Sequence, residues 1–124
     1  MRKQECQKGG QRAPIREYQS FFTTVHANLM CFFANEKDYN ELNAVSPPIN
    51  LFKCILNLLE DATLQRHVLH LETSDGAEYL FDPAGDENNQ NNLELWRKAI
   101  IEASRKFFSF FSIFHFYFNK RVFN

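Results

Sequence analysis

The most telling absences in this sequence are those of paired cysteines and of an excess of charge. Only three of the 124 residues are cysteines, they form no Cys-x-x-Cys pair, and their odd number argues against a disulfide framework. We therefore expect reduced thiols, as in cytosolic proteins, with Cys31 and Cys54 buried in apolar runs. A formal net charge of −1 excludes a polycation that binds nucleic acid through its overall charge.

Signals for secretion and for membrane insertion are also missing. The N-terminus has no apolar stretch of the kind that a secretory signal peptide carries. The Phe-rich run 107–118 is shorter than the roughly 20 apolar residues that a membrane-spanning helix needs. The length suffices for one domain with one hydrophobic core. We expect a single cytoplasmic domain with no transmembrane segment.

No pattern of catalytic or metal-binding residues stands out. His67 and His70 lie three apart on an expected strand, so their side chains point to opposite faces and cannot share a metal ion. Ser74 has no histidine and aspartate placed to activate it. Gly9-Gly10 lacks the strand and helix that flank a phosphate-binding loop. We therefore expect no enzymatic activity, no metal and no cofactor.

What the sequence does contain is a strong β-hairpin signal between residues 67 and 82. Apolar and polar residues alternate before and after a turn at Ser74-Asp75-Gly76. Glycine adopts the positive φ of a tight turn without steric cost, which makes Asp-Gly between two alternating runs a strong hairpin signal. Runs at 18–25, 29–33 and 49–59, the last broken near Lys53, predict further strands. Loops are expected at 7–14, 34–48 and 82–91.

One amphipathic helix is expected to begin near Asn91 or Asn92, either of which can cap its first turn. Its apolar residues recur at spacings of three and four and should cover the open end of the sheet. They are Leu93, Trp96, Ala99, Ile100 and Ala103. We expect Trp96, in the middle of this face, to fill the core.

The run 107–118 contains seven phenylalanines in twelve residues and has no polar helical face. Three interpretations stay open: it prolongs the helix, it inserts shallowly at a membrane interface, or it is a tail not shaped by selection for this fold. As an exposed apolar patch it is an aggregation hazard. We treat residues 106–124 as an atypical tail.

A series of short motifs occurs in a characteristic order along residues 1–105. They are Arg2-Lys3, a Lys/Gly/Arg loop, Arg16-x-Tyr18, Leu29-x-Cys31-Phe32-Phe33, Lys37-Asp38, Pro47-Pro48, His67-Val68, Ser74-Asp75-Gly76-x-Glu78-Tyr79-Leu80-Phe81 and Leu93-x-x-Trp96-x-x-Ala99-Ile100. Together they resemble a pleckstrin homology (PH) domain, of the subtype near the C-terminus of spectrin β-chains, with the β-heavy form as one candidate. The resemblance implies a mainly β fold, a bent antiparallel sandwich or barrel capped by one C-terminal helix.

The resemblance also implies a function. Many PH domains bind phosphoinositide head groups through the loop after the first strand, and the spectrin subtype tethers the membrane skeleton to the inner leaflet. It therefore implies a non-enzymatic adaptor that is peripheral to the membrane or the actin-associated cytoskeleton, with anionic phospholipids and membrane-skeleton proteins as partners. A PH-fold module that binds only proteins is the alternative, because fold does not fix function.

The candidate lipid-binding residues are basic. Residues 1–16 hold five basic residues against one acidic residue, a local charge of +4. Phosphate recognition needs converging cations and free backbone N–H groups, which a glycine-containing basic loop offers. The residues are Lys3, Lys8, Arg12 and Arg16, to which the resemblance adds Tyr18 and Arg66. The charges also fit weak electrostatic membrane contact, or ordinary solvated loop positions.

Two departures from the subtype's pattern bear on these expectations. Its first strand begins with a Gly-apolar-apolar stretch before Arg-Lys, so here, with Met1 directly before Arg2, most of that strand is expected to be absent. This would leave backbone unpaired and part of the core uncovered. The turn 61–66 has only Arg66 as a basic residue, where the subtype is rich in lysine, and Glu17 beside Arg16 should repel a phosphate.

Overall fold

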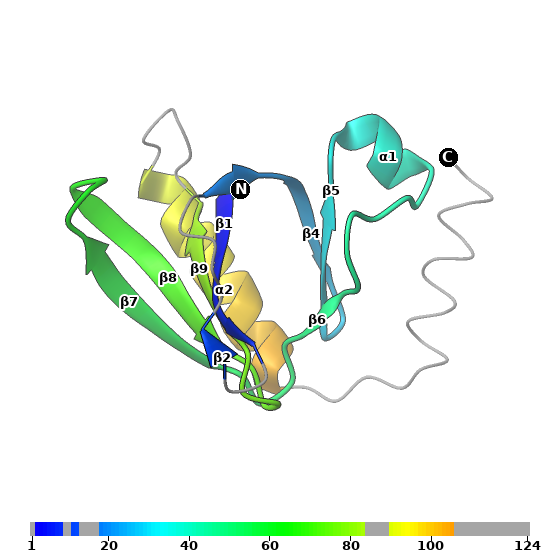
Figure 1. The fold of residues 1–124 in the computed structure, drawn as a ribbon. Helices are drawn as coiled ribbons and strands as arrows, with labels where there is room; N and C mark the ends of the chain where they lie inside the picture. The colour runs from blue at the N-terminus through cyan, green and yellow to red at the C-terminus, as the bar shows by residue number, and fades with distance from the viewer. Residues whose placement is uncertain (1, 9–10, 13–17, 84–89, 106–124) are drawn as a thin grey trace.

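The computed structural model describes residues 2–8, 11–12, 18–83 and 90–105, and at 2–8, 11–12 and 90 it describes the course of the backbone alone (Figure 1). The strands are β1 Arg2–Lys8, β2 Gln11–Arg12, β3 Gln19–Ser20, β4 Phe22–His26, β5 Leu29–Phe33, β6 Ile49–Asn50, β7 Ile55–Asp61, β8 Arg66–Glu72 and β9 Glu78–Asp82. The helices are α1 Glu36–Asn40 and α2 Gln90–Arg105.

The strands form two antiparallel sheets. One has the order β2-β1-β9-β8-β7, with β3 also paired to β1, and the other has the order β4-β5-β6. In Figure 1 the sheets form two walls, and α2 lies behind them and across the space between them. The expected fold class, mainly β with a C-terminal helix, is confirmed.

The predicted hairpin is present as β8 and β9. Its register runs from Leu69 opposite Phe81 to Glu72 opposite Glu78. At the turn, Gly76 has φ 91° and its N–H donates to the carbonyl of Thr73 at 3.0 Å. This positive φ is the reason that the turn needs glycine. The predicted break near Lys53 is also present, between β6 and β7, where Lys53 has φ 60°.

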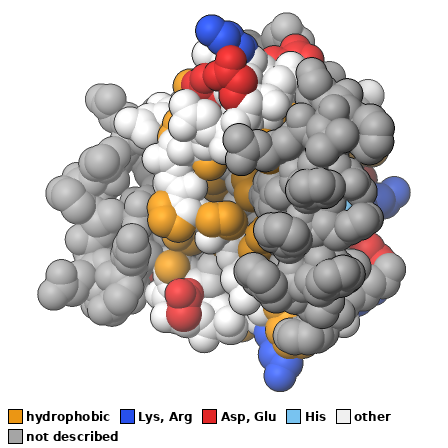
Figure 2. Space-filling model, turned by 90° about the vertical axis from the view of Figure 1, so that its right-hand side faces the viewer, with side chains coloured by type: hydrophobic (Ala, Val, Ile, Leu, Met, Phe, Trp, Pro, Cys, Tyr) orange, Lys and Arg blue, Asp and Glu red, His pale blue; other side chains and the backbone are white. Residues whose placement is uncertain are grey.

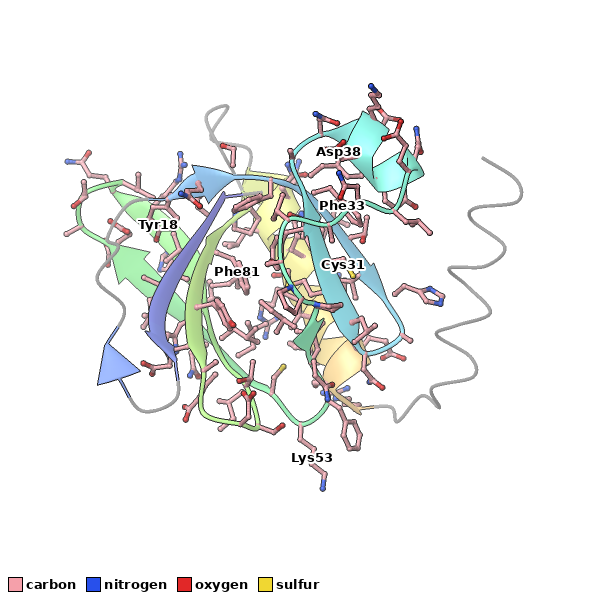
Figure 3. The ribbon with its side chains drawn as sticks, turned by 45° about the vertical axis from the view of Figure 1, so that its right-hand side comes forward. Tyr18, Cys31, Phe33, Asp38, Lys53 and Phe81 are labelled. Carbon is pink, nitrogen blue, oxygen red and sulfur yellow. The ribbon has the colours of Figure 1, made fainter. Side chains whose placement is uncertain are left out.

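The core lies between the two sheets. Phe32 from β5 and Phe81 from β9 are both fully buried, and their rings stack with centroids 6.0 Å apart. Figure 3 shows Phe81 in the interior, whereas Lys53 points away from it. Cys31 is 3% exposed, as predicted. Both walls therefore contribute aromatic side chains to one core.

Helix α2 covers this core with a narrower face than predicted. Ile100 is fully buried and Ala103 is 5% exposed, and Trp96 is partly buried against the core. Ala99, which we expected on the apolar face, is exposed. The helix end is fixed by the Asn28 side chain, whose Nδ2 donates to the carbonyl of Ala103 at 2.7 Å. This contact satisfies one of the last carbonyls of the helix, which have no partner inside it.

Two expected loops contain regular structure. The segment 34–48 includes α1, and the Asn35 side chain caps it by accepting the Asp38 N–H at 2.9 Å. The segment 7–14 includes the end of β1 and all of β2, which pair with each other. Strand β1, Arg2–Lys8, pairs with both β9 and β3, and the expectation that it is an incomplete first strand stays a prediction.

Two further expectations concern the C-terminal tail and membrane-spanning helices. The tail 106–124 and the domain boundary before it lie outside the described residues, so that division stays a prediction. In the parts of the chain that the structure covers, no helix has the length and apolar character to span a membrane.

Cys54, which we expected to be buried, is only partly buried, yet this burial should still make its thiol less reactive. Desolvation is the main cause that raises its pKa to about 11 from 9.0, outweighing a backbone hydrogen bond that lowers it. Since the thiolate is the reactive form, alkylation of Cys54 by iodoacetamide at pH 8 should be about a hundredfold slower in the folded chain than in urea. Peptide-resolved mass spectrometry measures both rates. Equal rates in the two states would contradict the burial of this thiol.

Candidate functional site

The basic N-terminal segment folds into a hairpin. Backbone pairing of Gln7 with Arg12 and of Lys8 with Gln11 sets Lys8 and Arg12 on neighbouring rungs of β1 and β2. Lys3 lies five residues before Lys8 on the same strand, about 16 Å away along its axis. Arg16 lies outside the described residues. The hairpin thus places the backbones of two predicted basic residues on neighbouring rungs at one end of the sheet.

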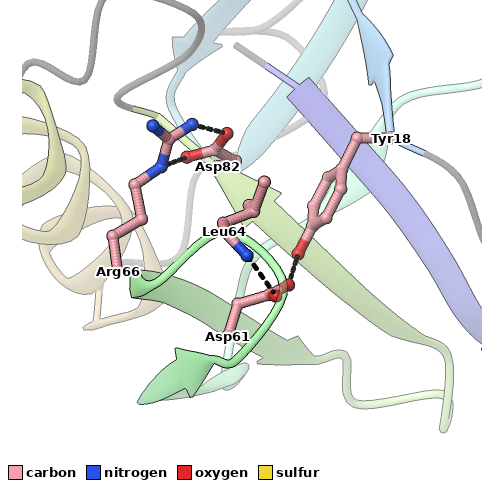
Figure 4. Close-up of polar contacts among 5 residues, drawn as sticks. All are labelled: Tyr18, Asp61, Leu64, Arg66 and Asp82. Carbon is pink, nitrogen blue, oxygen red and sulfur yellow. Dashed lines mark hydrogen bonds and ion pairs between the residues drawn. The ribbon is translucent and has the colours of Figure 1, made fainter.

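Arg66 is engaged with a buried carboxylate (Figure 4). Its Nη2 lies 2.5 Å from Asp82 Oδ2, and its Nε donates to Oδ1 at 3.1 Å. The side chain of Asp82 is 0% exposed and that of Arg66 is 12% exposed. Such a two-point pair compensates the charge of a carboxylate that is removed from water. The Asp82 carboxylate therefore competes with a lipid phosphate for the guanidinium group of Arg66.

Tyr18 is engaged with a second carboxylate. Its hydroxyl donates to Asp61 Oδ2 at 3.1 Å, and Asp61 Oδ1 accepts the N–H groups of Thr63 and Leu64 at 2.9 and 3.0 Å. Asp61 thus organises the turn between β7 and β8 and binds Tyr18 at the same time. This puts a negative charge in the turn where the spectrin subtype carries lysines.

The predicted residues do not converge on one pocket. Arg2 pairs with Asp82, the partner of Arg66, so Lys3 and Arg66 belong to the same end of the larger sheet. Gln7 pairs with Glu78, which places the basic hairpin at the opposite end. The six candidates therefore divide between two ends of the sheet, apart from Arg16, which is not described.

The rest of the described surface shows no concentration of positive charge. Glu78, opposite the basic hairpin, contacts His70 Nε2 at 3.2 Å. On the face drawn in Figure 2, hydrophobic side chains reach the surface near the middle, and the described Lys and Arg side chains lie towards the rim. The cations visible there form no cluster.

A hollow between β4 and α2 contains no Lys or Arg in its lining. It has a volume of about 570 Å³ and lies between β4 and α2. Its lining residues are Thr23, Thr24, Val25, His26, Tyr39, Asn92, Leu95, Trp96 and Ala99. We call it the β4–α2 groove. Burial lowers the pKa of His26 from 6.5. Sequence reasoning missed this groove, although Leu95, an apolar residue off the predicted apolar face, was a signal for it.

Among the described residues, no group of three or more His, Cys, Asp or Glu side chains could hold a metal ion. The second hollow, of about 200 Å³ between β6 and the β8–β9 turn, is also without Lys or Arg in its lining. Neither hollow therefore contains a residue of the predicted lipid site.

Comparisons with known proteins identify the fold. No family model matches the sequence, and no curated protein matches it. Among solved structures, the crystal structure of the pleckstrin homology domain of ArhGAP27 superimposes with a TM-score of 0.65 at 21% identity. The match covers 84% of this chain and 95% of that one. The chain thus has a PH-like fold, whereas the spectrin subtype stays a prediction.

Proposed function

We propose that this PH-fold domain is a non-enzymatic adaptor that contacts anionic phospholipid or phosphoinositide head groups through its basic hairpin. The observation that supports the proposal is the local charge of +4 in residues 1–16, of which Lys8 and Arg12 belong to the β1–β2 hairpin. The spectrin-like motifs add membrane-skeleton proteins as proposed partners and the cytoplasmic side of the membrane as the proposed location.

The proposed contact is electrostatic and weak. Each basic residue near an anionic leaflet contributes about 1 kcal/mol, and the attraction falls off within a Debye length. Arg66 and Tyr18, which would complete a stereospecific pocket, are bound to Asp82 and Asp61. We therefore expect salt-sensitive binding that depends on the hairpin and discriminates little between anionic lipids.

Vesicle co-sedimentation tests the proposal. The double variant Lys8→Glu, Arg12→Glu should bind phosphatidylserine vesicles at least about thirtyfold more weakly, since two cations near the leaflet are lost and two anions are added. The matched control reverses two exposed charges elsewhere, Lys37→Glu with Lys98→Glu, and should bind more tightly than the hairpin variant. Equal loss in both variants would contradict a hairpin-specific contact.

A further arm compares phosphatidylinositol bisphosphate vesicles with phosphatidylserine vesicles of equal charge. Equal pelleting supports the electrostatic contact, whereas a strong preference for the phosphoinositide indicates a stereospecific pocket. No pelleting with either lipid removes the membrane proposal.

The second candidate function is a protein-binding module without lipid affinity. The engagement of Arg66 and Tyr18 with carboxylates favours it, because both side chains are occupied at the place where the spectrin subtype binds lipid phosphates. Under this alternative the Lys8→Glu, Arg12→Glu variant keeps its protein partner, and the unmodified domain fails to pellet with vesicles.

A further inference from the structure

Strand β7 forms one edge of the larger sheet. It comes last in the order β2-β1-β9-β8-β7, and in the described part of the chain it pairs with β8 alone. Figure 1 shows it as the outermost strand of this wall, on the left. Strands β9 and β8 separate it from β1, so a continuation of β1 in its register does not reach this edge. An edge strand offers backbone N–H and C=O groups to another strand.

The side chains of this edge are largely apolar and exposed. Three of the five exposed large hydrophobic residues in the described ranges belong to β7: Ile55 is 55% exposed, Leu58 47% and Leu59 43%. Residues 55–59 include no charged residue and no proline, which are among the features that protect an edge from pairing. The edge therefore has the character of a contact surface.

We propose that β7 pairs antiparallel with β7 of a second copy of this chain, about a two-fold axis at Asn57. The pairing joins the larger sheets of the two copies into one continuous sheet. It goes beyond the proposed membrane contact, because β7 lies at the edge opposite the basic hairpin of β1 and β2.

Symmetry restricts the register of such a pair. A two-fold axis between antiparallel edge strands is perpendicular to the sheet and keeps its two faces, so the axis must pass through a residue position. A centre at Leu58 would set Ile55 opposite Asp61, an apolar side chain against a carboxylate. A centre at Leu56 would leave residues 58–61 without an opposing β7 residue.

The centre at Asn57 matches the residues by their chemistry. It sets Ile55 opposite Leu59 of the second copy on one face, and Leu56 opposite Leu58 of the second copy on the other. Each of these apolar pairs occurs twice, and such cross-strand pairs are the contacts that stabilise a sheet. At the axis the two Asn57 side chains meet, and each carboxamide can both donate and accept a hydrogen bond.

The charges at the two ends of β7 are also complementary. Lys53, which is exposed, lies two residues before the strand, whereas the exposed Glu60 and the partly buried Asp61 end it. Antiparallel pairing brings the basic end of each copy next to the acidic end of the other. Asp61 keeps its hydrogen bond from Tyr18, and its charge still attracts the lysine. This self-complementarity favours a second copy over an unrelated apolar peptide.

Sedimentation velocity of the full chain over a series of concentrations tests the proposal. The unmodified chain should show a reversible equilibrium that stops at the dimer, because two-fold pairing uses the edge of each copy once. Ile55→Lys and Leu59→Glu should each weaken the dimer by about tenfold or more, because symmetry changes two contacts at once. A monomer at every concentration, or open-ended oligomers, overturns the proposal.

A double variant tests the register. Ile55→Lys combined with Leu59→Glu sets the two introduced charges of opposite sign against each other, so the affinity should return to within about threefold of the unmodified chain. The control is Leu95→Lys on α2, a 66% exposed residue, which should leave the equilibrium unchanged. No recovery in the double variant, or an equal loss in the control, overturns the assignment to β7.

Disulfide formation between copies provides a second readout that adds no charge. In the proposed register the two Asn57 Cα atoms lie about 4.5–5.5 Å apart, which suits a disulfide. With copper phenanthroline as oxidant, Asn57→Cys should give a covalent dimer well above the background of the unmodified chain with its native cysteines. Ile55→Cys should stay at that background, because its two copies lie about 13 Å apart along the strands. Equal cross-linking at both positions, or none at Asn57, overturns the register.

Discussion

Replacing Phe81 by alanine should lower the free energy of unfolding by about 3–5 kcal/mol, the range for a large aromatic side chain removed from a packed core. Phe81 is fully buried. Its ring lies 6.0 Å from those of Phe32 on the opposite sheet and of Tyr79 on its own strand. Loss of the ring removes contacts that join the two walls and leaves a cavity between them.

Urea unfolding followed by Trp96 fluorescence measures this loss. Trp96 is the only tryptophan and packs against the same core, so its signal reports on that region. The control is Leu59→Ala on β7 of the larger sheet, where the side chain is 43% exposed and should lose about 1 kcal/mol or less. A similar loss in both variants would refute the central place of Phe81.

Replacing Arg66 by methionine should lower the free energy of unfolding by about 3 kcal/mol. The variant leaves the Asp82 carboxylate, which is 0% exposed, without its guanidinium partner. Removing one member of a buried ion pair costs about 3–5 kcal/mol, because the remaining buried charge loses the partner that compensates for its lost hydration. The 12% exposure of Arg66 places the expected value at the lower end of that range.

The exposed pair of Arg97 and Glu94 on α2 provides the control. Its atoms lie 3.2 Å apart, but the side chains are 40% and 52% exposed, so Arg97→Met should cost well under about 1 kcal/mol. The double variant Arg66→Met, Asp82→Leu should recover much of the stability lost by Arg66→Met. If Arg66→Met and Arg97→Met cost the same, the ion pair does not have the structural role assigned to it.

Much of the fold follows from local signals in the sequence. The β8–β9 hairpin is encoded by alternation around Asp75-Gly76, and the break at Lys53 by an interruption in an apolar run. Helix α1 was missed, because its cap at Asn35 lies in a polar segment that also fits a loop. The exposure of Ala99 was not predicted. The spacing of apolar residues shows which face of a helix is buried, but it does not show how broad that buried face is.

The site could be predicted only in part. The charge of the N-terminal segment is visible in the sequence, whereas the pairing of β1 with β2 was not predicted, because residues 7–14 were expected to form a loop. The partners of Tyr18 and Arg66 are not, since Asp61 is 43 residues from Tyr18 and Asp82 is 16 residues from Arg66. Only the pairing of the strands in the sheet brings these carboxylates next to the two side chains. There they compete with a lipid phosphate for Tyr18 and Arg66.

Amide NMR spectra of the ¹⁵N-labelled chain, recorded during a titration with phosphatidylserine nanodiscs, locate the proposed membrane contact on the domain. We expect shifts and line broadening concentrated at residues 7–12, which added salt reverses. Residues 61–66 should change little, because Asp61 and Arg66 keep their present partners. Perturbation centred on residues 61–66, or none at the hairpin, would contradict it.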